Sequence, residues 1–112
     1  TGPGVIAEEL IAEIAATVPP AVATFLLTSR QTAGEIIAQH HRCRTSTLQL
    51  CDRVVPGTHA ELRRALPGVT LVQVIHVTGP ESVAEALAVA PEVDALLLDS
   101  GNLSLFVKEL GG

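Results

Sequence analysis

The sequence predicts a parallel α/β fold built from a repeated strand–helix unit. Four short and nearly continuous apolar runs, of the kind found in strands buried on both faces, alternate with segments of helical periodicity. These runs end at Ser29, Cys51, Val77 and Asp99, so the repeat lengths are 51 − 29 = 22, 77 − 51 = 26 and 99 − 77 = 22 residues. Strands joined by single helices have to be parallel.

Two architectures satisfy this pattern. Right-handed crossovers between parallel strands give either a doubly wound open sheet, as in flavodoxin-like folds, or an arc of a barrel. The local pattern does not choose between them. A chain of 112 residues is long enough for one hydrophobic core, and its apolar content of 47% is mostly Ala, Val, Leu and Ile.

The first unit begins with a helix over residues 8–17, which ends before Pro19-Pro20. One apolar stripe is expected on this helix, made by Leu10, Ile11, Ile14 and Ala15. Residues 22–28 follow as the first strand. Three further strands are predicted over residues 46–51, 70–77 and 94–99.

The remaining helices are marked by a Thr-x-x-Glu pattern, in which each side chain can bond the other residue's backbone N–H at a helix start. This pattern occurs at Thr32 and Glu35, at Thr58 and Glu61, and at Thr78 and Glu81. The second helix of this group should end at residue 66, before Pro67-Gly68, and the third at residue 90, with Pro80 in its first turn. After a turn at residues 100–102, a short helical stretch is expected over residues 103–110.

Composition argues against several classes of function. A formal charge of −5, with two Phe and no Trp or Tyr, disfavours nucleic-acid binding. The longest apolar run is far below the ~18 residues of a membrane span, and no basic segment precedes an apolar one at the start, so a cytoplasmic protein is expected. Cys43 and Cys51 fit no disulfide framework or metal-knuckle spacing and are expected to be reduced.

Ligand sites in parallel α/β folds lie at the carboxyl ends of the strands. The candidates there are Thr28, Ser29, Arg30, Gln49, Cys51, Asp52, Arg53, His76, Thr78, Asp99, Ser100 and Asn102. Asp99 is the best chemical candidate, because a carboxylate directly after the apolar residues 95–98 can be partly desolvated and serve as a general acid. The alternative is that Asp99 caps the following turn.

The other reactive residues favour structural roles. A cysteine at a strand end, such as Cys51, is more often a small buried hydrophobe than a nucleophile. Residues 40–43 (HHRC) suggest a metal, but adjacent helical histidines point about 100° apart, which favours a solvated helix end that complements the helix dipole. His76 should share a strand face with Val72 and Val74, as a satisfied structural histidine.

Several ligand classes lack their motifs. The chain has no Gly-x-Gly-x-x-Gly, no Walker loop and no ordered Ser/His/Asp set. It also lacks the acidic pair after its first strand and the lysine at its last strand end that a response-regulator receiver would show. Gly111-Gly112 could belong to a phosphate loop.

Three stretches resemble phosphoribosylanthranilate isomerases. Residues 93–100 (VDALLLDS), followed by residues 110–112 (LGG), resemble the family's sixth strand and the loop after it. Residues 48–51 (LQLC) are similar to its fourth strand, Val-Gln-Leu-His-Gly. Residues 8–20, with the strand to Ser29, are similar to its second helix and third strand. The resemblance implies that residues 1–112 form a single partial domain, half of a TIM (β/α)8 barrel with four strands.

The resemblance also implies an activity. These enzymes act in tryptophan biosynthesis on N-(5'-phosphoribosyl)anthranilate, a phosphorylated sugar–anthranilate compound, by an Amadori aldose–ketose isomerisation that uses no cofactor and no metal. Asp99 matches the family's general acid, and Gln49 matches a glutamine that lines the pocket. Cys51, Gly111 and Gly112 fall at further substrate-binding positions.

The chain also departs from the family pattern. The family's general base is a cysteine in a Lys-x-Cys-Gly segment of the first strand, and its phosphate loops follow the last two strands; neither has a counterpart here. Gly4 stands where an arginine is usual, Cys51 replaces a histidine, and Gln73 stands where a basic residue is expected. We therefore expect the isolated chain to be an inactive fragment. The alternative is a non-catalytic half-barrel or flavodoxin-like scaffold, and in either case an uncovered sheet should drive self-association into a dimer or larger assembly.

Overall fold

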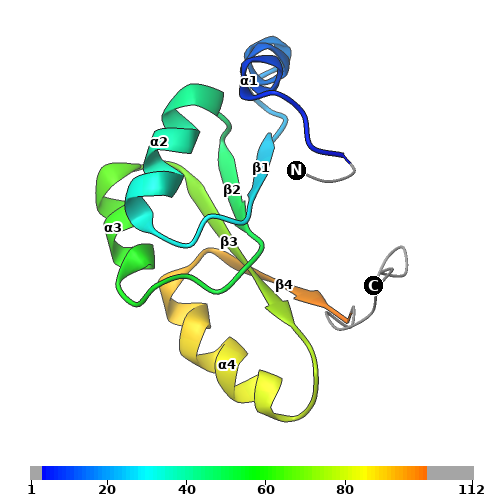
Figure 1. Cartoon of the computed structure of the whole chain (residues 1–112), viewed down its shortest axis with the longest axis vertical. Coiled ribbons are helices and arrows are strands. Elements are labelled where there is room, and N and C mark those ends of the chain that lie inside the picture. Colours follow the sequence, from blue (N-terminus) through cyan, green and yellow to red (C-terminus); the bar gives the residue numbers. More distant parts are fainter. Residues whose placement is uncertain (1–3, 101–112) are drawn as a thin grey trace.

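A computed structural model describes residues 4–100 of the chain. In chain order, the elements are α1 (Glu8–Thr17), β1 (Phe25–Thr28), α2 (Ala33–Cys43), β2 (Thr47–Leu50), α3 (Thr58–Ala65), β3 (Thr70–His76), α4 (Glu81–Val89), the 3-10 helix η1 (Ala90–Glu92) and β4 (Ala95–Asp99). The described strands form one sheet in the order β1-β2-β3-β4, and every neighbouring pair is parallel (Figure 1). The predicted parallel α/β class and its strand–helix repeat are confirmed.

The strand order favours the barrel arc. A doubly wound sheet reverses its strand order at one point, so that its helices cover both faces. No such reversal occurs among the described strands, and right-handed crossovers that all run in one direction place the connecting helices on one face. Figure 1 shows α2, α3 and α4 to one side of the sheet.

The core lies between the sheet and these helices. Leu26, Leu48 and Leu71 are in register across β1, β2 and β3, and each is at most 3% exposed. Ile36 of α2 and Leu62 of α3 pack into the same cluster and are fully buried. Burying a side chain of this size is worth about 1.5–3 kcal/mol, so the helix-covered face carries most of the fold's hydrophobic stabilisation.

The opposite face of the sheet is open at its edges. Phe25, Leu27 and Leu97 alternate with the core residues of their strands and are 49%, 60% and 38% exposed. On the central strand, Val72 and Val74 of the same face are buried. In a barrel this face would be the interior, which side chains from the other strands fill.

The predicted elements agree with the structure except at their ends. The helix over 8–17 is confirmed to the residue. The first strand begins at Phe25, three residues later than predicted, because the N–H of Val22 bonds the carbonyl of Pro19 in a turn. The helix predicted to reach Ala90 ends as an α-helix at Val89 and continues as η1.

The capping patterns mark the helix starts but not their geometry. Thr32 and Thr78 donate side-chain hydrogen bonds to the carboxylates of Glu35 and Glu81, at 2.9 and 2.8 Å, instead of accepting from the backbone. Thr58 lies inside α3 and is buried, and the cap is Gly57, whose φ of 91° suits glycine. The predicted reciprocal caps are therefore wrong, although three helices begin close to where the pattern placed them.

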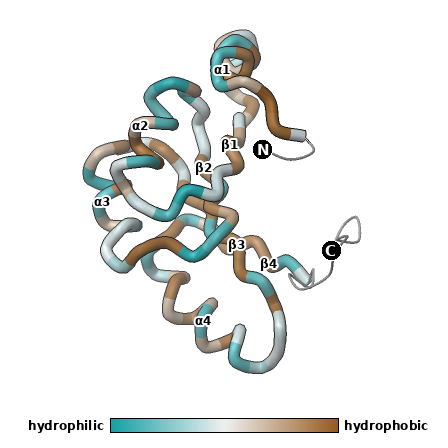
Figure 2. The backbone as a smooth tube through the Cα atoms, in the orientation of Figure 1, coloured by the Kyte–Doolittle hydropathy of each residue, from teal (hydrophilic) through white to brown (hydrophobic). Residues whose placement is uncertain are grey.

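The helix α1 is less well covered than its apolar stripe suggests. None of its residues is buried, and Leu10 and Ile14 are 45% and 49% exposed. An ion pair of 2.5 Å between Glu8 and Arg42 joins it to α2. Its stripe and β1 line an open hollow of about 820 Å³. Figure 2 shows that the segment just before α1, which also lines this hollow, is hydrophobic.

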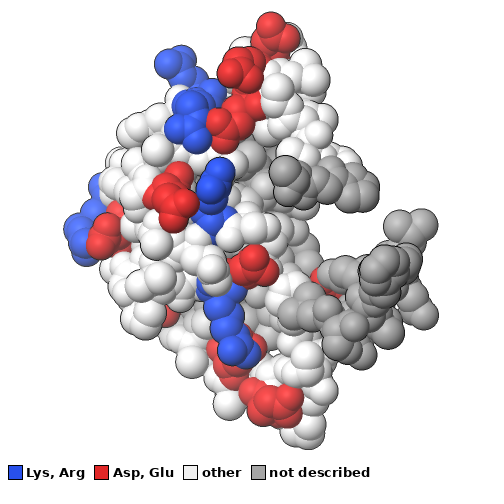
Figure 3. Space-filling model, in the orientation of Figure 1, with Lys and Arg blue, Asp and Glu red and all other residues white. Residues whose placement is uncertain are grey.

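Charged side chains of both signs lie beside one another over the helices (Figure 3). Besides Glu8 with Arg42, the pairs include Arg53 with Glu85 at 2.6 Å, and Arg30 with Glu35 at 3.4 Å. Such exposed pairs contribute little to stability.

Within residues 4–100, no helix has the length and apolar character needed to cross a membrane.

Candidate active site

Three of the predicted site residues lie on the face of the sheet opposite the helices. Gln49 on β2 is in register with Val72 on β3, and His76 at the end of β3 is in register with Asp99 at the end of β4. Because side chains alternate along a strand and neighbouring strands are in register, Gln49, His76 and Asp99 share one face. His76 shares its strand face with Val72 and Val74, as predicted.

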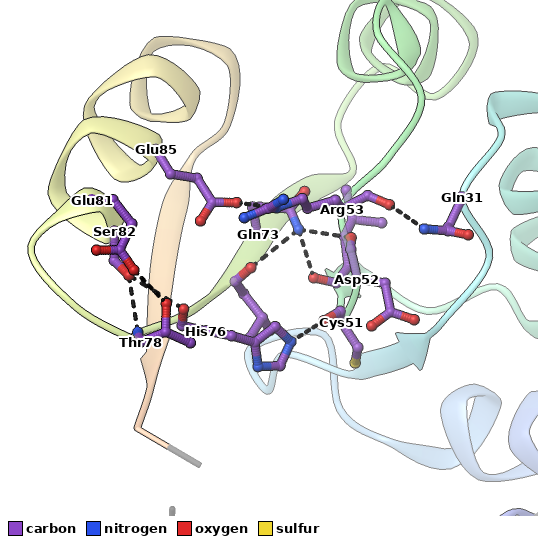
Figure 4. A network of polar contacts seen from close by, with 12 residues as sticks. Gln31, Cys51, Asp52, Arg53, Gln73, His76, Thr78, Glu81, Ser82 and Glu85 are labelled. Atoms are coloured by element: carbon purple, nitrogen blue, oxygen red, sulfur yellow. Dashed lines mark hydrogen bonds and ion pairs between the residues drawn. The ribbon is translucent and has the colours of Figure 1, made fainter. Parts of the chain in front are cut away.

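His76 connects the ends of three strands. Its Nε2 lies 2.8 Å from the carbonyl oxygen of Cys51, just after β2 (Figure 4). Its Nδ1 lies 3.6 Å from Oδ2 of Asp99 on β4. The N–H of Val77 bonds the carbonyl of Asp99 at 2.8 Å, which fixes the two strand ends together. The side chains of His76 and Asp99 are 18% and 21% exposed, so both are largely shielded and still within reach of solvent.

The contact with Cys51 settles which nitrogen of the ring carries a proton. A carbonyl oxygen can only accept a hydrogen bond, so Nε2 of His76 must donate. In the neutral ring, Nδ1 is then an unprotonated acceptor that faces the carboxyl group of Asp99. In the charged ring, Nδ1 carries a second proton and forms an ion pair with Asp99.

Cys51 lies beside His76, directly after β2. The Sγ of Cys51 donates to the carbonyl of Gln49 at 3.6 Å, and the residue is partly buried. The loop that follows is fixed from both sides, because Gln31 donates to the carbonyl of Arg53 at 2.8 Å and the Arg53 side chain pairs with Glu85 (Figure 4).

Gln73 lies on the other face of the sheet. It is 2% exposed and points toward α3, where its Oε1 is 2.9 Å from Nε2 of His59. Its Nε2 donates to the carbonyls of Leu50 and Asp52 at 3.1 and 2.9 Å. Sequence reasoning missed this buried network, whose only signal was one glutamine in an otherwise apolar strand.

The reactive residues around α2 do not converge. The rings of His40 and His41 are 6.3 Å apart and tilted, and Nε2 of His40 bonds the carbonyl of Thr45 at 2.7 Å. Burial raises the pKa of the Cys43 thiol, with the Glu8 carboxylate adding to the effect. Residues 4–100 contain no cluster of three or more His, Cys, Asp or Glu side chains that could hold a metal ion.

Part of the predicted site lies outside the described residues. This holds for Asn102, for the helical stretch predicted over residues 103–110, and for Gly111 and Gly112. Of the predicted site residues, His76 is paired with Asp99 and bonded to the carbonyl of Cys51, whereas Gln49 lies on the same face of the sheet two strands away from Asp99.

The chain is similar to part of a distant curated protein. It is 28% identical over 89 residues to an N-(5'-phosphoribosyl)anthranilate isomerase of Methanocella arvoryzae. The match covers 80% of this chain and 42% of that protein, so the chain spans less than half the length of the relative it matches. No family model matches the chain, and no solved structure matches it.

Proposed function

We propose that this chain supplies the central strands of a barrel isomerase that acts on N-(5'-phosphoribosyl)anthranilate, with Asp99 as the proton donor. One observation supports this above all. Asp99 stands at the carboxyl end of its strand, on the face that a barrel would enclose, and this is where barrel enzymes carry their catalytic groups. The distant likeness to the isomerase of Methanocella arvoryzae points to the same chemistry.

The reaction gives each residue a defined task. Opening the ribose ring requires a proton at the ring oxygen, which the Asp99 carboxyl donates. Removal of the proton at C2 then gives an enol-amine, which becomes the ketone. Gln49, on the same face, hydrogen-bonds the substrate through its side-chain amide, and Cys51 forms part of the pocket wall.

Other parts of the reaction lie outside the described residues. The resemblance assigns the general base to the first barrel strand and the phosphate loops to the last two, and Gly111 and Gly112 to the loop after the sixth. We therefore propose that residues 1–112, from the family's second helix to that loop, are inactive alone.

The test is a chimera. The matched 89-residue segment of the Methanocella arvoryzae isomerase is replaced by the corresponding segment of this chain, and turnover is followed by anthranilate fluorescence. Asp99→Asn should lower kcat by about 10²–10⁴, the usual contribution of a general acid, and leave KM nearly unchanged. The matched control is Asp94→Asn, at the amino end of the same strand, which should keep kcat. Equal kcat for Asp99→Asn and the parent chimera would rule out the proposed role.

A second proposal concerns the isolated chain. Phe25, Leu27 and Leu97 are exposed on the uncovered face, and the outer edges of β1 and β4 have no neighbouring strand among the described residues. Such a surface favours self-association. Light scattering should give a dimer or larger assembly, and Leu27→Glu should dissociate it. A wild-type chain that stays monomeric at high concentration would contradict this proposal.

A further inference from the structure

We propose that His76 is a positioning residue that holds the proton which Asp99 delivers to the substrate, and that recovers it from solvent after each turnover. The inference rests on the proposed function of Asp99. It starts from a requirement of the chemistry, because an aspartate has an ordinary pKa of about 3.9 and is ionised at neutral pH. A general acid at this position needs a neighbour that keeps a proton available.

The geometry gives His76 this task. Its Nε2 is committed to the carbonyl of Cys51 at 2.8 Å, so the ring cannot turn without losing that bond. Its Nδ1 is buried, lies 3.6 Å from Oδ2 of Asp99 and makes no hydrogen bond to any described residue. A small movement of either side chain brings the two atoms into hydrogen-bond distance.

The proton transfer balances. When the ring is charged, Nδ1 of His76 carries the second proton and faces the carboxylate of Asp99. When the substrate binds, the N–H bond at Nδ1 breaks and a proton moves to Oδ2 of Asp99, while the ring oxygen of the ribose takes one proton from the carboxyl group. The ring is left neutral with its proton on Nε2. Nδ1 itself is buried, so water returns the proton to it when the side chain moves, and the 18% exposure of that side chain keeps solvent close by.

The other ionisable groups at this end of the sheet are engaged elsewhere or carry the same sign as Asp99. Arg53 pairs with Glu85 of α4, and Glu81 accepts from the hydroxyl of Thr78. Asp52 follows Cys51 in the loop after β2 (Figure 4). Asp99 is thus the ionisable group that the structure pairs with His76 among the described residues.

The structure also offers a matched comparison within the chain. His40 has the same arrangement of its ring, with Nε2 bonded to the carbonyl of Thr45 at 2.7 Å and a buried Nδ1 that makes no hydrogen bond to the described residues. It differs in that no carboxylate among those residues forms an ion pair with it. A change that acts through a carboxylate should therefore affect His76 and not His40.

The first test is nitrogen NMR of the histidine rings in the full 112-residue chain at neutral pH. Asp99→Asn should shift the Nδ1 signal of His76 toward that of an unprotonated ring nitrogen and leave both ring nitrogens of His40 in place. An Nδ1 signal of His76 that is the same in both chains would overturn the pairing. This measurement needs no activity, so it is independent of the proposed function.

The second test uses the active chimera. His76→Ala should lower kcat about 100-fold at neutral pH with little change in KM. The activity of this variant should rise as the pH falls, because solvent then protonates Asp99 directly. Added imidazole should restore its turnover. A purely structural role would give none of the imidazole rescue, so its absence would overturn the proton-holding role. A folded wild-type chimera without activity would overturn the proposed function, and with it the catalytic part of this inference. The NMR comparison would still decide whether His76 is paired with Asp99.

Discussion

Replacing Gln73 by leucine tests the buried network between the sheet and α3. Leucine has a similar size and fills the same space, but it cannot take part in the hydrogen bonds to His59, Leu50 and Asp52. The Nε2–H of His59 would lose its acceptor at a site where the residue is only 7% exposed. The carbonyl oxygens of Leu50 and Asp52, and that of Val74 at 3.3 Å, would each lose one donor.

The expected cost follows from the number of groups left without a partner. A buried donor or acceptor without a partner costs about 1–3 kcal/mol, and a carbonyl with a second bond costs less. We count the full cost for the His59 donor and part of the cost for the carbonyl oxygens, and we subtract the favourable burial of leucine. On this basis, Gln73→Leu should lower the free energy of unfolding by about 3 kcal/mol. That is a large part of the total for a domain of this size.

The assay is urea unfolding followed by far-ultraviolet circular dichroism, because the chain has no Trp or Tyr for intrinsic fluorescence. Gln31→Leu is the matched control, because Gln31 is exposed and its side chain donates to the carbonyl of Arg53 as its one hydrogen bond to the described residues. Its effect should stay within about 0.5 kcal/mol. If Gln73→Leu unfolds at the same urea concentration as the wild-type chain, with the same slope, the buried network does not stabilise the fold.

Three further changes have defined outcomes. Arg44→Gly should raise the free energy of unfolding by about 0.5–1 kcal/mol in the same urea assay. Arg44 directly follows α2 with a φ of 58°, which glycine adopts without strain. A loss of stability would contradict this prediction. The N–H of Leu71, and after it Arg63, holds the pKa of the Asp94 carboxyl below its ordinary value. The stability that this carboxylate contributes is therefore present above the ordinary pKa and is lost as the pH falls through the lowered one. At acid pH, the free energy of unfolding should fall more steeply for the wild type than for Asp94→Asn. Iodoacetamide should modify Cys51 about tenfold faster than Cys43, because Cys43 is buried and burial raises the pKa of its thiol. Peptide mass spectrometry measures the two rates. Equal rates in the folded chain would refute the burial of Cys43.

The order and type of the elements could be predicted because each one is encoded locally. Prolines and glycines bound the helices, and each strand is a short apolar run that its neighbours bury. The ends were harder, because they depend on hydrogen bonds that a sequence does not display. Val22 is as apolar as its neighbours, and it leaves the first strand only because its N–H bonds Pro19 in a turn.

The site could be predicted in part. The rule that ligands gather at the carboxyl ends of parallel strands placed Asp99, Gln49 and Cys51 among the candidates, and their roles in a site stay predictions. The contact between His76 and Asp99 was missed, because it depends on the register of β3 against β4. A signal was nevertheless present: the two residues are 99 − 76 = 23 positions apart, the same offset that relates Thr47 to Thr70.

This constant offset also bears on how the chain acquires its structure. Phe25 pairs with Thr47, Thr47 with Thr70, and Val72 with Ala95, so consecutive strands always join residues 22 or 23 positions apart. Because the separations are nearly equal, each pairing step costs a similar loop-closure entropy, which grows only slowly with loop length. Each strand can also add to the previous one as soon as its helix has been synthesised, so the sheet can grow on the ribosome from β1 toward β4 without waiting for the end of the chain.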